Sequence, residues 1–171
     1  ELAEKADIPV VSTLMNLGAI SRKHPLSLGM VGMHGQTEAN QAVHNSDLLI
    51  TIGARFSDRV TGDVNHFAKN AVIAQIDIDE SEIDKNVVVD LSLIGDMREI
   101  LSRLLEKTEK KKNPVWLEKI DSFRVPKAIS EDAFVPQNIF KVIHEVLGDD
   151  VIVATDVGQH QMWTAQEWPF T

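Results

Sequence analysis

The sequence of 171 residues contains no cysteine and no tyrosine. Without cysteine, the chain can form no disulfide, thiolate zinc site or iron–sulfur cluster, and it has no cysteine nucleophile. Basic residues are scarce as well, since 17 Lys and Arg stand against 26 Asp and Glu, a net charge of −9. This balance disfavours nucleic acids and anionic membranes as partners, and no apolar run approaches the ~18 residues of a membrane span. We therefore expect an acidic, soluble, intracellular protein.

Both ends of the sequence are typical of a piece of a longer protein. No Met begins the chain, and Glu1 to Ala6 have the pattern of the last turns of a helix. Residues 161–171 carry two of the three tryptophans and end without a polar tail. A natural terminus that packs on its own core is the alternative, but we expect truncation.

Apolar patterning predicts the α/β class. Short, nearly continuous apolar runs are typical of parallel strands that are covered on both faces. Helical spacing of apolar residues alternates with these runs, which favours right-handed crossovers. The predicted strands are residues 9–14, 48–52, 72–78 and 151–154, and the predicted helices are 36–45, 97–110 and 136–147.

The composition changes at the charged run 106–113. We predict one domain over residues 1–107, a linker over 108–130, and the N-terminal portion of a second domain over 131–171. The charged run has a second interpretation as a solvated helix end.

Three glycines lie within residues 29–35, directly before a predicted helix. Glycine allows positive φ and close approach of a ligand, and a helix N-terminus offers free N–H groups. The segment matches neither the Walker loop nor the G-x-G-x-x-G fingerprint. A ligand loop and a tight connector both remain open.

Two arginines, Arg55 and Arg59, follow the second predicted strand. Ligands of open α/β sheets lie beyond the carboxyl ends of the strands, so this pair suits a phosphate or another anion. Surface ion pairs with Asp58 and Asp63 are the alternative.

Acidic residues close the third predicted strand. Asp77 and Asp79 could accept hydrogen bonds from ribose, bind a hard cation, or cap the following turn. A metal is the least favoured of the three. Further on, Asp96 precedes a predicted helix and has an N-cap interpretation.

The segment 155–163 follows the last predicted strand and contains Gly, Gln and His in succession. These groups can present a backbone N–H, an amide and an imidazole to a diphosphate. The six histidines show no metal-binding pair such as H-x-x-x-H, and no Ser–His–Asp or G-x-S-x-G arrangement is visible. The residues alone therefore predict a nucleotide-like ligand at strand ends and name no reaction.

Taken together, five segments resemble the catalytic large subunit of acetolactate synthase (acetohydroxyacid synthase), a thiamine-diphosphate enzyme of three α/β domains. RFSDRVTG and GQHQMW are the most specific motifs, and the resemblance covers nearly the whole chain. The segments are residues 24–35, 46–62, 76–85, 94–97 and 155–166.

The resemblance implies a Rossmann-like central FAD-binding domain, a parallel sheet with helices on both faces, that lacks its first strand and glycine loop. The beginning of the thiamine-diphosphate-binding domain, a second α/β unit, follows it. The family's FAD contacts fall on Thr13, Leu14, Gly32, Met33, His34, Gly53, Ala54, Arg55, Arg59, Val60, Asp77, Gly95 and Asp96. Its thiamine diphosphate contacts fall on Val157, Gly158, Gln159 and His160.

The resemblance also places the activating glutamate before Glu1 and the Mg²⁺ motif after Thr171. The piece therefore holds no catalytic residue or metal ligand and is expected to be inactive. The parent would condense two pyruvates, or pyruvate with 2-oxobutyrate, with release of CO2, the first common step of branched-chain amino acid biosynthesis. It would form a homo-oligomer (dimer or tetramer) with a regulatory small subunit, in the bacterial cytoplasm or in a plant or fungal organelle.

Two residues depart from the family pattern: Ser57 replaces a common Asp, and Asp84 replaces a usual Gly. We expect these changes to alter FAD affinity. The alternatives are a related carboligase or decarboxylase such as glyoxylate carboligase, an NAD-binding deacetylase core, a structural nucleotide-binding module, or an interaction domain for a regulatory subunit.

Overall fold

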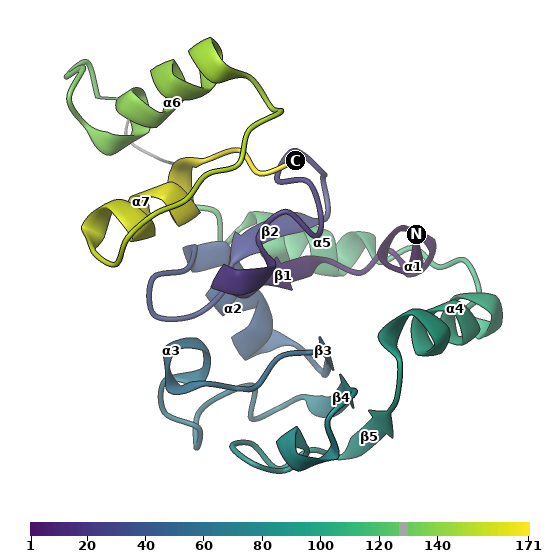
Figure 1. Ribbon diagram of the computed structural model, residues 1–171. Coiled ribbons are helices and arrows are strands. Elements are labelled where there is room, and N and C mark those ends of the chain that lie inside the picture. The colour runs from purple at the N-terminus through teal and green to yellow at the C-terminus, as the bar shows by residue number, and fades with distance from the viewer. Residues whose placement is uncertain (127–129) are drawn as a thin grey trace.

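A computed structural model describes residues 1–126 and 130–171. Helices and strands alternate along most of the chain (Figure 1). The strands are β1 (Val10–Ser12), β2 (Ser27–Met30), β3 (Leu48–Ile52), β4 (Val72–Asp77) and β5 (Leu91–Ile94). The α-helices are α1 (Leu2–Ala6), α2 (Thr37–Asn45), α3 (Asp58–Thr61), α4 (Met97–Lys107), α5 (Pro114–Asp121), α6 (Pro136–Leu147) and α7 (Gln159–Glu167), with 3₁₀ turns η1 (Leu14–Asn16) and η2 (Glu80–Glu82).

All strand pairs are parallel, which confirms the predicted α/β class. β1 pairs with β2 in one sheet, and β3, β4 and β5 form a second sheet in that order. The predicted strands at 9–14, 48–52 and 72–78 are confirmed as β1, β3 and β4, with β1 shorter than expected. The helices predicted around 36–45, 97–110 and 136–147 are confirmed as α2, α4 and α6.

The strand predicted at 151–154 is wrong. This segment has no regular structure, and Ile152 is fully exposed. A strand needs a neighbouring strand to satisfy its N–H and C=O groups, and among the described residues none pairs with this segment. Conversely, β2 and β5 were not predicted as strands: Gly29 interrupts the apolar pattern of the first, and the second has only four residues.

The core lies between β3–β4 and α2. Ile73 of β4 belongs to a buried cluster with Ala39 and Val43 of α2. Ile120 of α5, 1% exposed, belongs to the same cluster, so this helix packs on residues 1–107, called the first unit below, although it lies within the predicted linker. Residues 131–171 are called the second unit. The division of the chain into domains stays a prediction.

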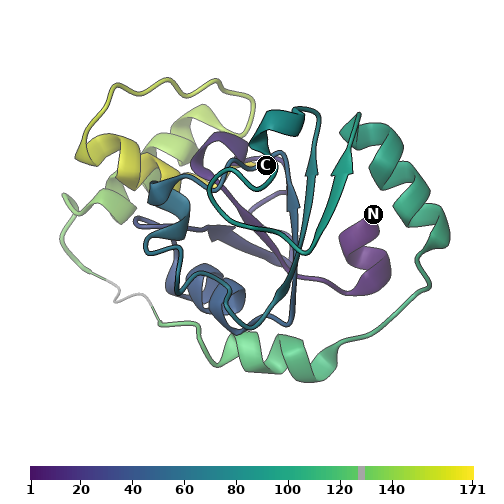
Figure 2. The same ribbon diagram turned by 90° about the horizontal axis from the view of Figure 1, so that it is seen from below.

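The opposite face of the three-stranded sheet is apolar and partly exposed. Its side chains alternate with those of the core face, as the register of β3, β4 and β5 requires. Helix α4 lies on this side of the strands and α2 on the other (Figure 2). The exposed members of this face are Leu48, Ile52, Val72, Leu91 and Leu93.

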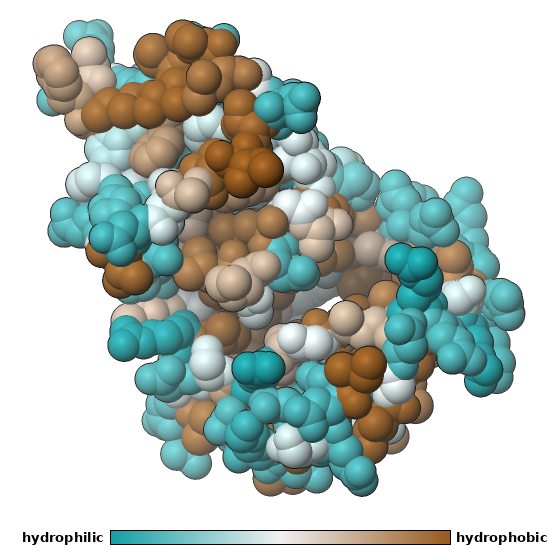
Figure 3. Space-filling model, viewed as in Figure 1, coloured by the Kyte–Doolittle hydropathy of each residue, from teal (hydrophilic) through white to brown (hydrophobic). Residues whose placement is uncertain are grey.

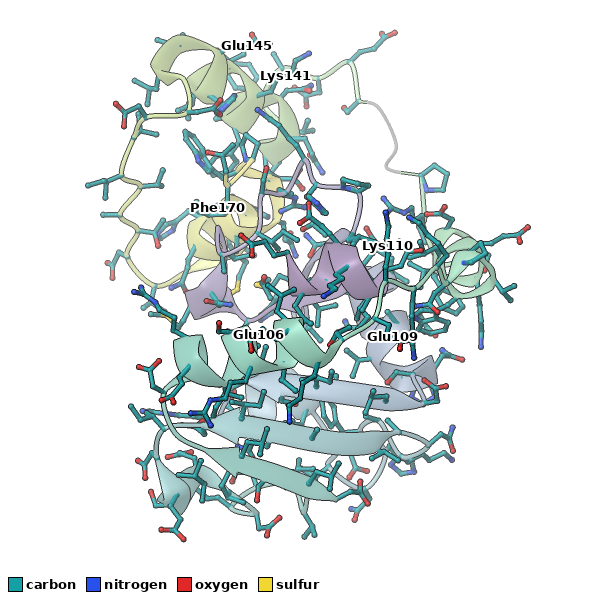
Figure 4. All side chains as sticks on the ribbon, turned by 90° about the vertical axis from the view of Figure 1, so that its right-hand side faces the viewer. Glu106, Glu109, Lys110, Lys141, Glu145 and Phe170 are labelled. Carbon is teal, nitrogen blue, oxygen red and sulfur yellow. The ribbon has the colours of Figure 1, made fainter. Side chains whose placement is uncertain are left out.

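Helix α6 presents a second apolar surface. Brown, hydrophobic side chains cover this end of the molecule in Figure 3. Val142, Val146 and Leu147 are each more than half exposed, while Lys141 and Glu145 form an exposed ion pair on the helix (Figure 4). No helix among the described residues is long and apolar enough to cross a membrane.

Candidate functional site

The residues predicted to contact FAD follow the carboxyl ends of all five strands described. Within each of the two parallel sheets these ends lie along one edge, which is where ligands of open α/β folds bind. Each strand supplies a part: Thr13 and Leu14 follow β1, Gly32 to His34 follow β2, Gly53 to Arg55 follow β3, Asp77 ends β4, and Gly95 and Asp96 follow β5.

Two of these loops are fastened to each other. The main-chain N–H of Met33 donates to the carbonyl oxygen of Arg59 at 2.8 Å, and Arg59 Nη1 lies 3.8 Å from Met33 Sδ. Gly32 has φ +110°, and a Cβ there would lie 2.4 Å from the same carbonyl oxygen. Gly35 has a similar constraint, since its Cβ would lie 2.3 Å from the oxygen of Met30. Close packing of the chain on itself therefore explains two of the glycines in the 29–35 loop.

The side chain of Asn40, on α2, hydrogen-bonds the loop after β2, a role that the sequence did not reveal. Its Oδ1 accepts from the N–H of Gly32 at 2.8 Å, and its Nδ2 donates to the oxygen of Gly32 at 2.9 Å. The side chain thus satisfies both main-chain groups of one loop residue. An asparagine on the helix directly after a glycine-rich loop is the signal that could have indicated it.

A second group of predicted residues meets at the ends of β3, β4 and β5. Gly95 N–H donates to the oxygen of Asp77 at 3.0 Å, and Gly53 N–H donates to the oxygen of Ile76 at 2.8 Å. The Asp77 side chain is buried at this edge and accepts from the N–H of Asp79. Gly53, Asp77 and Gly95 therefore form one continuous edge.

The capping interpretations of two acidic residues are confirmed. Asp96 accepts from the N–H groups of Arg98 and Glu99 at the start of α4. Asp79 accepts from both the N–H and the hydroxyl of Ser81, and these hydrogen bonds lower the pKa of the Asp79 carboxyl. Both carboxylates therefore cap the element that follows them.

The two arginines are exposed, with 77% of the Arg55 side chain and 72% of the Arg59 side chain accessible. Their ion pairs are long: Arg55 Nε lies 4.0 Å from Glu82, and Arg59 Nε lies 4.0 Å from Asp58. Asp63 forms its ion pair with His66 instead, and that hydrogen bond lowers the pKa of the Asp63 carboxyl. Because both guanidinium groups are exposed and their ion pairs are long, both can bind an anion.

The main chain at Arg55 is held by another residue that the sequence did not reveal. Asn86 Nδ2 donates to the Arg55 oxygen at 2.8 Å. Beneath it, Glu82 is 8% exposed, and its Oε1 accepts from Lys85 Nζ at 2.7 Å. The segment after β4 therefore supports the loop after β3.

The four residues predicted to contact thiamine diphosphate lie together at the start of α7. Gly158 is the N-cap of this nine-residue helix, and Gln159 and His160 form its first turn. The first N–H groups of a helix have no partner within the helix and favour anions. Val157, directly before the N-cap, is 80% exposed, so the N-terminus of the helix is accessible.

Among residues 1–126 and 130–171, no group of three or more His, Asp or Glu side chains is placed to hold a metal ion.

A further contact joins α7, which begins with the predicted thiamine diphosphate contacts, to the loop after β2, which carries predicted FAD contacts. Gln166 Nε2, in the last turn of α7, donates to the carbonyl oxygen of His34 at 2.8 Å. Gln166 is the last residue of the segment 155–166, which resembles the family, but nothing in the sequence pattern distinguishes it from the other glutamines nearby.

Comparison with known proteins gives one family match. Residues 1–104 match the family described as thiamine pyrophosphate enzyme, central domain. The matched range contains all five strands and every residue predicted to contact FAD.

Individual relatives match over nearly the whole chain. A probable acetolactate synthase large subunit from Methanocaldococcus jannaschii is 46% identical over 96% of the chain, and the acetolactate synthase large subunit of Corynebacterium glutamicum is 45% identical over 96%. The isozyme 1 large subunit of acetolactate synthase from Escherichia coli is 39% identical over 99%. The chain spans 30%, 28% and 31% of the lengths of these three relatives.

Proposed function

Because the chain belongs to the thiamine pyrophosphate enzymes through their central domain, we propose that it is part of an acetolactate synthase large subunit. The activity would condense two pyruvates to 2-acetolactate, or pyruvate with 2-oxobutyrate to 2-aceto-2-hydroxybutyrate, each with release of one CO2. The relatives named above, at 39–46% identity, support this assignment. Since they are about three times as long as this chain, the activity is proposed for a protein of their length.

The proposed flavin site rests on one observation: predicted contact residues follow the carboxyl end of every strand described. The donor set suits FAD, because Arg55 and Arg59 offer exposed cations for its diphosphate, and Asp77 offers a carboxylate for ribose hydroxyls. The full proposed set is Thr13, Leu14, Gly32, Met33, His34, Gly53, Ala54, Arg55, Arg59, Val60, Asp77, Gly95 and Asp96.

The proposed diphosphate site for thiamine diphosphate is the start of α7, at Val157, Gly158, Gln159 and His160. The free N–H groups of the first helical turn suit the diphosphate charge. When bound, this cofactor supplies the carbanion stabilisation that decarboxylation of a 2-keto acid needs. We propose that Mg²⁺ is held by residues outside this chain. The four residues at the start of α7 would bind and orient only the diphosphate end of the cofactor.

Partners and location are proposed on the same family basis. We expect a homo-oligomer with a regulatory small subunit, in the bacterial cytoplasm or in an organelle of a plant or fungus. Co-purification of a smaller subunit with the full-length protein tests the first expectation.

Turnover tests the proposed activity. A protein of the relatives' length that contains these residues should convert pyruvate to acetolactate with thiamine diphosphate, Mg²⁺ and FAD, while the 171-residue chain alone shows no turnover. A full-length protein that binds FAD but forms no acetolactate would indicate another carboligase. Turnover by the 171-residue chain would show that the assignment of the catalytic glutamate and the metal ligands to other segments is wrong.

A further inference from the structure

Helix α7 is fastened to the segment between β1 and β2 by Arg22. The guanidinium Nη1 of Arg22 donates to the oxygen of Ala165 at 3.1 Å, and its main-chain N–H donates to the oxygen of Phe170 at 2.8 Å. Phe170, labelled in Figure 4, lies close to α7. Burial lowers the pKa of the Arg22 guanidinium, and the carbonyl at the end of the helix offers it a favourable dipole.

The contact is packed as well as hydrogen-bonded. Thr164, Ala165 and Trp168 are all at least nine-tenths buried. The Trp168 ring meets the His144 ring of α6 edge to face, with centroids 5.5 Å apart. The last turn of α7 is therefore packed against α6 and hydrogen-bonded through Ala165 to Arg22, in the segment before β2.

This placement brings Gln166 to the loop after β2. The residue directly follows Ala165, whose carbonyl Arg22 holds, and its Nε2 donates to the oxygen of His34 at 2.8 Å. Asn40 holds the other end of the same turn through both main-chain groups of Gly32. The turn from 32 to 34 is thus held by one helix from each unit.

We propose that Gln166 is a positioning residue of the flavin site, so that the second unit completes a site otherwise built by the first. The proposal rests on the flavin site proposed above. Gln166 touches no ligand in this account; it fixes the peptide of His34, a predicted FAD contact. Without the hydrogen bond from Gln166, FAD would have to order this turn as it binds, and the cost of ordering would weaken binding.

Substitutions at this position separate hydrogen bonding from bulk. Gln166→Leu removes the donor, whereas Gln166→Lys keeps a donor of similar reach. Gln161→Leu is the matched control, because Gln161 lies on the first turn of the same helix and none of the hydrogen bonds described above involves its side chain. Thermal unfolding of each variant shows whether it is folded before binding is measured.

Hydrogen exchange of the ligand-free chain is the first measurement. The N–H groups of Met33 and Gly35 are hydrogen-bonded to Arg59 and Gly32, so their protection reports the order of the turn. We expect these amides to exchange several-fold faster in Gln166→Leu and at the wild-type rate in Gln166→Lys and Gln161→Leu. Unchanged exchange in Gln166→Leu would overturn the proposal.

FAD titration by flavin fluorescence is the second measurement. Loss of one hydrogen bond predicts about three- to tenfold weaker binding by Gln166→Leu, with Gln166→Lys within about twofold of wild type. If wild type and Gln166→Leu bind FAD equally well, the proposed role of Gln166 is overturned, while the flavin site still stands. A wild-type chain that binds no FAD would overturn the flavin site itself.

Discussion

The carboxylate of Asp7 accepts a 2.9 Å hydrogen bond from the main-chain N–H of Asn113, 106 positions later in the chain. The Asn113 side chain donates in return to the carbonyl oxygens of Ala6 and Asp7. This reciprocal contact joins the end of α1 to the start of α5. It closes the first unit around its core before the chain continues toward α6.

Replacement of Asp7 tests this closure. Asp7→Ala leaves the part-buried Asn113 N–H without its acceptor and places alanine at φ 55°. We expect the free energy of unfolding to fall by about 1–3 kcal/mol. Asp7→Asn retains an acceptor and tolerates this backbone conformation, so it should lose less than about 1 kcal/mol. Urea unfolding measures both, and equal losses would contradict the proposed contact.

Glycine substitutions separate backbone conformation from close packing. Gly62 has φ +61° with nothing within 4 Å of a built Cβ, while at Gly32 the Cβ would lie 2.4 Å from the oxygen of Arg59. Gly62→Ala should cost about 1–3 kcal/mol from conformation alone. Gly32→Ala should cost more, because the two loops must move apart, and it should also weaken FAD binding. Equal unfolding free energies for the two variants would show that the loops are not in contact.

Asp84 is one of the two departures from the family pattern, and it has φ 55°. Its Oδ1 accepts from the N–H of Val89 at 2.8 Å, which offsets the strain of a side chain in this region. Asp84→Gly should therefore lie within about 1 kcal/mol of wild type, since it loses the bond and the strain together. Asp84→Ala loses only the bond and should be less stable than Asp84→Gly by about 1 kcal/mol. Denaturant unfolding of both variants measures this difference. An alanine variant as stable as the glycine variant would contradict the proposed strain at residue 84.

The pair of Asp149 with His144 predicts a pH dependence. The hydrogen bond from His144 and the nearby Lys23 lower the pKa of the Asp149 carboxyl. The folded state then binds fewer protons than the unfolded state, so the stabilisation is present above the unfolded pKa of about 3.9 and is lost as pH falls through the folded pKa.

Asp149→Asn should therefore be less stable than wild type at pH 6, and the difference should shrink as pH falls below about 4 and vanish below the folded-state pKa of Asp149. Asp150→Asn, one position later, is the matched control and should show no such convergence. Tryptophan fluorescence follows the unfolding, because Trp168 contacts His144. A difference between Asp149→Asn and wild type that persists at low pH would contradict the assigned cause.

Much of the fold was predictable from local patterns. The runs at 48–52 and 72–78 are long and β-branched, and both form parallel strands in register. The same pattern at 151–154 forms no strand, because a strand also needs a partner that local sequence does not encode. β5 shows the converse, since four residues become a strand by pairing with β4.

The location of the candidate site could be predicted from the sequence, whereas most of the side-chain contacts that support it could not. Glycines and charged residues at strand ends indicated where a ligand would bind, because parallel strands align their carboxyl ends. The supporting side chains Asn86 and Gln166 were not predictable. Each hydrogen-bonds a main-chain group of a loop that lies far from it in sequence, and such contacts leave no periodic pattern.

Titration of the 171-residue chain with FAD and, separately, with NAD tests the flavin site most directly. We expect saturable FAD binding, weakened in Arg59→Ala, with no binding of NAD. The control Arg103→Ala removes an exposed arginine of α4 that pairs with Glu99, and it should bind FAD as wild type does. Binding of NAD without FAD, or FAD binding that is equally strong in both variants, would contradict the proposed site.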